Sequence, residues 1–210
     1  YLPLYIFAGE HLLCARLRTA DQDAAAGSKD EVERIVSRIR AAWPEVRIIV
    51  RADSGFCREE LIKWCEDNGV YYVIGFARNE RLRRIIEPQM QQAAQIHKQT
   101  GKVARVFTEF SYQTTTGSWS RSRRVAAKAE QLDGKENPRF VVTNLSAEEW
   151  PTQGLYEELY CARGEMENRI KEQLSLFAYR VSAETMKANQ LRVNFAGMAY
   201  VLTHGLRRLG

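Results

Sequence analysis

Hydrophobic residues follow two different periods along this chain. Through residue 101, short apolar runs alternate with stretches in which apolar residues recur every three or four positions. The runs predict strands, and the recurring positions predict helices that each bury one face. The predicted strands are 1–7, 12–17, 46–50 and 70–76, and the predicted helices run from Ser28 to before Pro44, over 57–68 and over 79–97 with a kink at Pro88.

The pattern changes after Gly101 to strict alternation of apolar and polar positions, as in 106–112. Strands are predicted over 106–112, 119–127 and 140–142, separated by turns, so 102–145 is expected to form a small antiparallel sheet inserted between helices. A helical pattern returns from Pro151 to about Phe177, and a last helix is expected from Ser182. This order predicts an α/β chain with a mixed sheet flanked by helices, divided at 1–101, 102–145 and 146–210.

Composition places the chain among ordinary soluble proteins of about one domain. Its 210 residues are 45% hydrophobic and 27% charged. The sequence contains no apolar run of membrane-spanning length, and its first residues do not read as a signal peptide, so no membrane partner is expected. Four cysteines without C-x-x-C spacing predict free thiols in a reducing cytoplasm, and three scattered histidines argue against a His-based triad.

The positive charge of the chain is concentrated in one segment. Between Lys98 and Arg139, nine basic residues stand against four acidic ones, and this excess equals the net charge of +5 of the whole chain. Such a cluster is typical of proteins that bind nucleic acid. A solvated basic face that keeps a small sheet soluble is an equally open interpretation.

An acidic residue directly follows one of the predicted strands. The apolar run 46–50 leads into an Arg-Ala-Asp-Ser-Gly segment in which the acid is Asp53. Sites of α/β sheets form at the carboxyl ends of parallel strands, which favours a catalytic carboxylate here. The alternative is a turn in which Asp53 or Ser54 bonds to the backbone ahead of the next helix.

A second acidic residue lies on a polar stripe of the helix predicted from Pro151. Tyr160, Arg163, Glu167 and Lys171 are spaced by 3, 4 and 4 residues and lie beside an apolar stripe, rotated from it by about 100°. They would lie at the rim of the buried face, unless they form a surface ladder of ion pairs. Two carboxylates on rigid elements with cations alongside suit metal-assisted phosphodiester chemistry.

Three arginines follow a tryptophan in the predicted inserted sheet. Trp119 with Arg121, Arg123 and Arg124 would suit phosphate contacts beside a residue that stacks on bases. An edge strand protected by charge against aggregation is the alternative.

The stripe Tyr160-x2-Arg163-x3-Glu167 resembles the signature of DDE transposases from bacterial insertion sequences. Together with the Arg51–Phe56 segment, it is similar to the subgroup named for insertion sequence thirteen-eighty. The resemblance covers essentially the whole chain. It implies a ribonuclease H-like core in which two Asp and one Glu hold two divalent metal ions, Mg²⁺ or Mn²⁺, with a β-rich insertion before the Glu.

Carried over residue by residue, the resemblance makes Asp53 the second catalytic Asp and Glu167 the catalytic Glu, both as metal ligands. Tyr160, Arg163 and Lys171 would bind DNA phosphates near the cut end. The implied activity is cutting of transposon ends and joining to target DNA, by a homodimer on DNA, in the bacterial cytoplasm at the nucleoid.

The chain departs from the family pattern at two places. The family carries a Lys seven residues after the Glu, where this chain has Leu174, so Lys171 is the nearest cation on that stripe. The first catalytic Asp belongs to a strand that would precede Tyr1, and Asp21 and Asp23 are poor substitutes for it. We therefore expect a transposase fragment that is inactive alone.

Two other functions fit the same sequence. One is a different metal-dependent nuclease on the same core, which would hydrolyse DNA without joining strands. The other is a non-catalytic DNA-binding module derived from a transposase.

Overall fold

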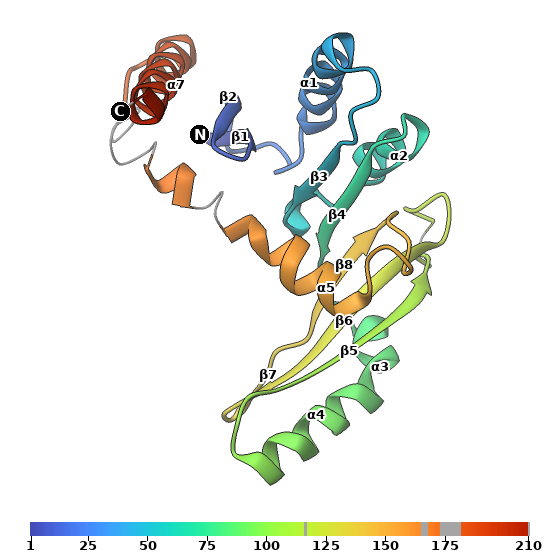
Figure 1. The fold of residues 1–210 in the computed structure, drawn as a ribbon. Coiled ribbons are helices and arrows are strands. Elements are labelled where there is room, and N and C mark those ends of the chain that lie inside the picture. Colours follow the sequence, from blue (N-terminus) through green and yellow to red (C-terminus); the bar gives the residue numbers. More distant parts are fainter. Residues whose placement is uncertain (116, 165–167, 173–181, 210) are drawn as a thin grey trace. The chain divides into compact units, whose positions relative to one another are not determined.

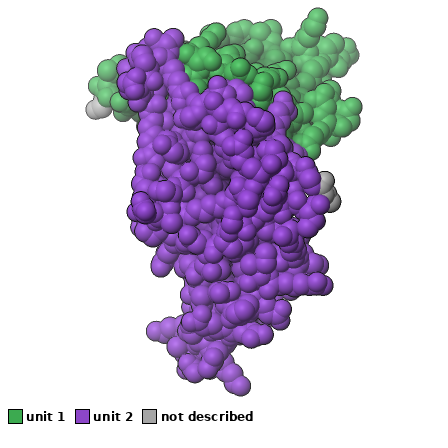
Figure 2. All heavy atoms as spheres, turned by 90° about the vertical axis from the view of Figure 1, so that its right-hand side faces the viewer, with its two compact units in different colours: residues 1–38, 163–210 green, residues 39–162 purple. Residues whose placement is uncertain are grey.

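The computed structural model of the chain describes residues 1–115, 117–164, 168–172 and 182–209 (Figure 1). The chain forms two compact units, coloured separately in Figure 2. We call residues 1–38 with 163–210 the hairpin unit, and residues 39–162 the sheet unit. In the described part of the chain, no helix is long and apolar enough to span a bilayer.

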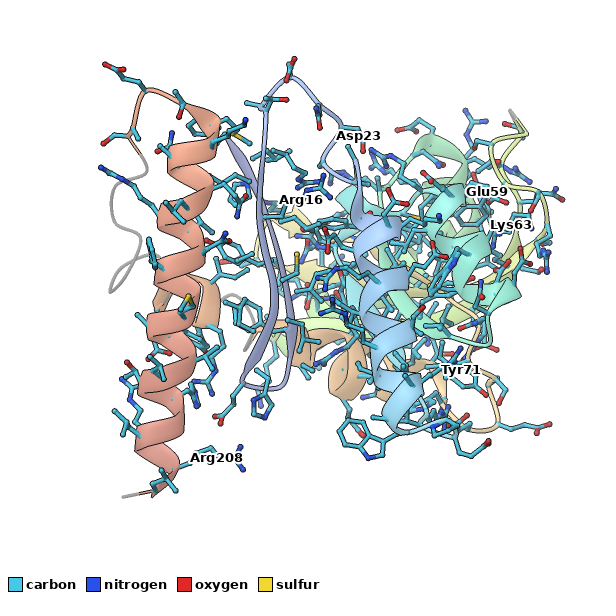
Figure 3. The ribbon with its side chains drawn as sticks, turned by 90° about the horizontal axis from the view of Figure 1, so that it is seen from above. Arg16, Asp23, Glu59, Lys63, Tyr71 and Arg208 are labelled. Atoms are coloured by element: carbon cyan, nitrogen blue, oxygen red, sulfur yellow. The ribbon has the colours of Figure 1, made fainter. Side chains whose placement is uncertain are left out.

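The hairpin unit is built on two antiparallel strands, β1 (Leu2–Ala8) and β2 (His11–Arg18), which confirms the predicted hairpin. Helix α7 (Met186–Leu209) packs on β2, where the Gln190 amide accepts from Leu17 N at 2.7 Å and donates to Ala15 O at 3.0 Å. Most of α1 (Ser28–Ala42) also belongs to this unit, and Figure 3 shows the hairpin between α7 and α1. The last helix thus begins at Met186, four residues after the expected Ser182.

The sheet unit contains a mixed six-stranded sheet, which confirms the predicted fold class. Its main path runs β3-β4-β8-β6-β5, and β7 pairs with β6. The pair β3–β4 is parallel, whereas the other pairs are antiparallel. The strands are β3 (Ile49–Ala52), β4 (Tyr71–Phe76), β5 (Ala104–Tyr112), β6 (Arg123–Leu132), β7 (Lys135–Glu136) and β8 (Arg139–Thr143).

Strands of the predicted insertion continue the sheet of β3 and β4. This happens because β8 lies between β4 and β6 and pairs with both. The β8 residues from Phe140 to Thr143 are almost completely buried, as expected for a strand with neighbours on both edges. The antiparallel strands therefore share a core with the parallel pair, while the division at 101/102 and 145/146 stays a prediction.

Helices cover both faces of this sheet. Tyr72 points toward α2 (Glu59–Asp67), where its hydroxyl donates to Glu66, and the next residue, Val73, points to the opposite face. There Val73 packs against Leu155 and Tyr156. The helices α3 (Glu80–Ile85) and α4 (Glu87–Thr100) replace the single predicted helix, with Pro88 in the first turn of α4 and α4 packed on β5 and β6.

The segment after Pro151 differs from the regular α-helix that was predicted. It consists of a short α5 (Thr152–Gly154), the π-helix η2 (Leu155–Tyr160) and the 3₁₀-helix η3 (Cys161–Arg163). The wide π-turn places Leu159 and Tyr160 together against the core, so Tyr160 is half-buried rather than at the rim. Residues 168–172 are helical.

Candidate active site

Asp53 lies at the carboxyl end of β3, directly before the 3₁₀-helix η1 (Ser54–Phe56). Its Oδ1 accepts a hydrogen bond from Gly55 N at 2.8 Å, and its side chain is exposed. The alternative of an Asp turn is therefore correct as a local geometry. The same bond fixes the carboxylate at a sheet edge where α/β proteins place their sites.

β3 is an edge of the described sheet, where it pairs with β4. It begins three residues later than expected, because Val46 N donates to Trp43 O in a turn that follows α1. Its residues are half-buried or exposed, although the apolar run 46–50 would have suited a buried strand. The edge position leaves the strand end and Asp53 accessible.

The residue beside Asp53 on the neighbouring strand is Gly75, and it was not expected at the site. A Cβ placed on Gly75 would lie 2.6 Å from Tyr160 Oη, 2.9 Å from Ser54 N and 3.3 Å from the Asp53 carbonyl carbon. The glycine thus allows the Tyr160 hydroxyl and the Asp53–Ser54 peptide to approach the same point of β4. A glycine inside an apolar strand often marks such a close approach, and this was the available signal in the sequence.

Arg51 was likewise not expected as a site residue. Its Nη1 donates to the Leu159 carbonyl at 2.9 Å, across 108 positions of sequence. Arg51 pairs in register with Val73, and both residues therefore face the layer that contains η2. The structure thus brings together Asp53 and Tyr160, two of the predicted site residues, with Arg51 and Gly75 between their elements.

The other residues of the polar stripe belong to the hairpin unit. Glu167 lies outside the described residues, Arg163 is the last residue of η3, and Lys171 is exposed. The expected approach of Asp53 and Glu167 therefore stays a prediction.

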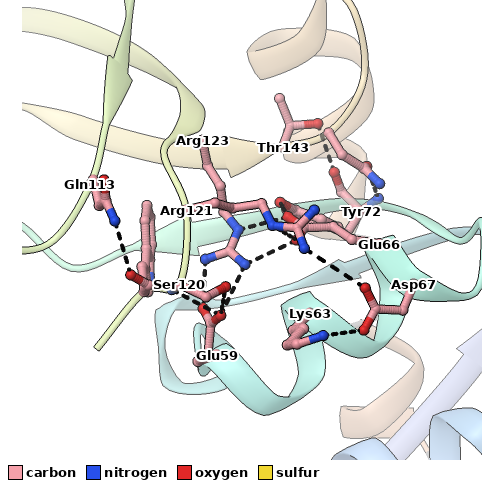
Figure 4. A network of polar contacts seen from close by, with 12 residues as sticks. Glu59, Lys63, Glu66, Asp67, Tyr72, Gln113, Ser120, Arg121, Arg123 and Thr143 are labelled. Atoms are coloured by element: carbon pink, nitrogen blue, oxygen red, sulfur yellow. Dashed lines mark hydrogen bonds and ion pairs between the residues drawn. The ribbon is translucent and has the colours of Figure 1, made fainter. Parts of the chain in front are cut away.

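The arginines of β6 and the preceding loop occupy three different environments. Arg123 is buried, with 2% of its side chain exposed, between Glu59 and Glu66 of α2 at 2.6 Å each (Figure 4). Arg124 donates to Glu109 and to the carbonyls of Leu145 and Trp150. Arg121 has 53% of its side chain exposed.

We call Glu59, Glu66, Tyr72, Ser120 and Arg123 the Arg123 cluster. Burial would raise the pKa of Glu66, but hydrogen bonds from Arg123 and Tyr72 outweigh it and hold that pKa below its usual range. Burial would likewise raise the pKa of Glu59, but hydrogen bonds from Arg123 and Ser120 outweigh it and lower that pKa. Both acids therefore stay charged beside Arg123.

Trp119 belongs to the interior as well. It is 4% exposed, and its ring stacks on Phe76 at 4.8 Å between centroids. In this arrangement Trp119 and Arg123 stabilise the interior, and Arg121 has the exposed side chain that a phosphate contact needs. β6 lies between β5 and β8, so protection of an edge strand does not explain these arginines. DNA binding by Trp119, Arg121, Arg123 and Arg124 stays a prediction.

Acidic partners neutralise much of the basic segment that stood out in the sequence. Five of its nine cations form ion pairs with glutamates: Arg105, Arg121, Arg123, Arg124 and Lys128. Some of these acids, such as Glu59 and Glu66, come from outside the segment. Local charge counting therefore overestimates the charge that a polyanion would meet here.

Asp53 suits a hard divalent cation as one donor of a set. Its carboxylate is exposed and fixed by Gly55, and Mg²⁺ and Mn²⁺ prefer oxygen ligands. Among the residues that the structure describes, no group of three or more acidic, histidine or cysteine side chains could hold a metal ion. None of the four cysteines forms a disulfide in the structure.

Comparison with protein families shows what kind of domain carries these features. The family model described as transposase DDE domain group 1 matches residues 1–210. The chain belongs to this family. A comparison with curated proteins gives no match. The acid at the end of β3 is accordingly an acid of a transposase domain, and DNA is the substrate class on which such domains act.

Proposed function

We propose that this DDE domain cuts transposon ends and joins them to target DNA, with Asp53 and Glu167 as two of its metal-ligating carboxylates. The observation that carries the proposal is the position of Asp53. It is exposed at the carboxyl end of β3, fixed by Gly55 N, and adjacent to the segment that ends in Tyr160. The family match supplies the reaction class.

In this proposal, Asp53 contributes oxygen ligands at a position set by β3 and η1. Bound Mg²⁺ or Mn²⁺ ions, two in the active enzyme, would activate the attacking water or 3′-hydroxyl and stabilise the leaving oxygen. Tyr160, Arg163 and Lys171 bind phosphates near the cut end. Lys171 replaces the lysine that the family carries at the position of Leu174, because leucine has no charge with which to bind phosphate. Arg121 adds an exposed cation for the DNA backbone.

The finer assignments belong to the same proposal. We place the domain in the subgroup of insertion sequence thirteen-eighty, acting as a homodimer on DNA. Asp53 and Glu167 should then share a metal centre, with their carboxylates within several Å of each other.

The test compares Asp53→Asn with Asp133→Asn, since Asp133 is another exposed aspartate of the sheet unit. Mn²⁺ binding is measured by the electron paramagnetic resonance signal of the free ion, and cleavage and joining are followed on labelled transposon-end DNA. We expect D53N to lose Mn²⁺ affinity and D133N to keep it. In a polypeptide extended before Tyr1, where cleavage is expected, D53N should lose cleavage and D133N should keep it.

Retained Mn²⁺ affinity in D53N would refute Asp53 as a ligand. In the extended polypeptide, cleavage without strand joining would favour the hydrolytic nuclease, and DNA binding without either reaction would favour the non-catalytic module. Cleavage by the extended polypeptide and not by the present chain would support the expectation that the first Asp lies before Tyr1.

A further inference from the structure

We propose that Arg51 and Gly75 are positioning residues, which lock the start of the Tyr160 segment onto the turn that carries Asp53. Neither residue has a role in the proposed chemistry. The inference rests on the proposed function for its effect on cleavage, whereas its structural consequences can be measured independently.

The first contact of this lock is a charged side chain on a carbonyl. Arg51 Nη1 donates to Leu159 O at 2.9 Å. Arg51 lies two residues before Asp53 on the same short strand, so the bond ties the backbone of η2 directly to the strand that positions the acid. Leu159 precedes Tyr160, the first member of the polar stripe. A hydrogen bond from a charged donor is stronger than a neutral one, which suits a single link between distant segments.

The second contact is a space that only glycine leaves open. A side chain at residue 75 would meet Tyr160 Oη at 2.6 Å and Ser54 N at 2.9 Å. The hydroxyl lies at the end of a side chain, but Ser54 N is backbone of η1 and cannot move without moving the Asp53 cap. Gly75 has no positive φ, so its role concerns space rather than backbone freedom.

The irregular helix explains why such a lock is needed. The six residues of η2 form a π-helix, a conformation that is less stable than an α-helix and is frequent at functional sites. Within it, the rings of Tyr156 and Tyr160 contact each other in a tilted arrangement, with 5.5 Å between their centroids. Contacts at Leu159 and Tyr160 fix the end of η2. They therefore fix the position of Tyr160, which is the first residue of the polar stripe.

The consequence is a coupling between the Asp53 turn and the Tyr160 segment. A substitution at Arg51 or Gly75 should increase the mobility of both the Asp53 turn and the Tyr160 segment, although Asp53 and Tyr160 themselves are unchanged. Since a misplacement of about 1 Å can reduce a reaction rate about a hundredfold, the effect on cleavage should appear in the rate constant and not in DNA affinity.

The experiment measures amide hydrogen exchange and resonance positions by NMR in the full chain, with the variants Gly75→Ala, Arg51→Met and Arg51→Lys. Gly205→Ala is the matched control, because a Cβ there meets nothing within 4 Å. Arg38→Met controls for removing an exposed arginine. We expect G75A and R51M to speed exchange at Gly55 at least about tenfold and to shift the signals of residues 155–160, with R51K partly restoring them.

A double-variant cycle tests the Tyr160 contact. Removal of the hydroxyl in Tyr160→Phe takes away the atom nearest to the added methyl group, so G75A should cost less in the Y160F background than in the wild type. Additive effects would overturn the contact between Gly75 and the hydroxyl. Should G75A fail to fold, R51M tests the same lock through the Leu159 carbonyl.

Unchanged Gly55 exchange in both G75A and R51M would overturn the inference. If a polypeptide extended before Tyr1 binds no Mn²⁺ and cleaves no DNA, the proposed function fails, but the exchange data on the present chain still decide whether the lock exists. Where cleavage is present, a rate lowered about 10- to 100-fold at unchanged DNA affinity supports positioning, and an unchanged rate overturns it.

Discussion

The Arg123 cluster and the Asp53 turn are two polar regions of the same sheet unit, and they differ in how far their charged groups are exposed. In the Arg123 cluster, a guanidinium with 2% exposure meets two glutamates that also accept from Tyr72 and Ser120 (Figure 4). At the Asp53 turn, an exposed carboxylate accepts from Gly55 N.

This difference teaches which charges are available for a ligand. Buried charges must be paired and hydrogen-bonded, because an unpaired ion in the interior is strongly destabilising. The charged residues of the Arg123 cluster pair with one another, so we interpret the cluster as a structural feature of the fold and not as a ligand site. The Asp53 carboxylate is held in place while remaining accessible, which is what a metal ligand requires.

The largest expected effect concerns the Asp53 turn. In a polypeptide extended before Tyr1, Asp53→Asn should reduce transposon-end cleavage by at least about a thousandfold, since metal-ion catalysis depends on its carboxylate ligands. The free energy of unfolding should change by less than about 1 kcal/mol, because asparagine can still accept from Gly55 N as a cap. Cleavage rates with Mn²⁺ and urea unfolding check the two parts, and a large loss of stability would place Asp53 with the structural charges instead.

The Arg123 cluster should show the reverse behaviour. Arg123→Ala leaves Glu59 and Glu66 without their buried partner and should lower the free energy of unfolding by about 3 kcal/mol. Arg121→Ala is the control, because the Arg121 side chain is 53% exposed and its longer ion pairs with Glu66 and Asp67, at 3.5 and 3.8 Å, should contribute less than about 1 kcal/mol. Urea unfolding measures both. Equal losses in the two variants would contradict the distinction between buried and exposed pairs.

A buried acid outside the Arg123 cluster sharpens the comparison through the pH dependence of stability. Burial would raise the pKa of Glu130, but hydrogen bonds from Lys128, Arg105 and Asn137 outweigh it and lower the pKa to about 2. A depressed pKa in the folded state means that Glu130 stabilises the fold above the pKa of the unfolded chain, near 4.3, and that this stabilisation disappears as the pH falls toward 2.

Glu130→Gln should therefore lose less of its unfolding free energy between pH 5 and pH 2 than the wild type loses. Because the variant is expected to be less stable than the wild type at pH 7, the two proteins are compared by the slope of their unfolding free energy against pH, measured by urea unfolding. Equal slopes would show that Glu130 titrates normally in the folded chain.

The smallest expected effect is on DNA affinity. If Arg121 contacts a phosphate, Arg121→Ala should weaken binding a few-fold and reduce the slope of log K against log salt by about 1. Arg123→Met should leave that slope unchanged in protein shown to be folded, because its charge is already neutralised. Titrations of labelled DNA at several salt concentrations decide this. A slope reduced by R123M and not by R121A would reverse the assignment.

Sequence patterns were sufficient to predict the local elements and the position of the candidate acid. Alternating and helical periods predicted the hairpin and the strands β4, β5, β6 and β8, and Pro88 predicted a kink close to where α3 ends and α4 begins, because these features follow from side chains that are near in sequence. The Asp-Ser-Gly turn after an apolar run placed Asp53 at a strand end, and the structure confirms that placement.

Tertiary structure alone decided how distant segments meet. The pairing of β8 with β4, which joins the predicted insertion to the main sheet, leaves no periodic signal, since both strands are apolar and could accept several neighbours. The burial of Arg123 depended on glutamates about 60 residues away. The approach of Tyr160 to Gly75 depended on a π-turn that no sequence pattern predicted, although Gly75 itself was visible as a glycine inside an apolar strand.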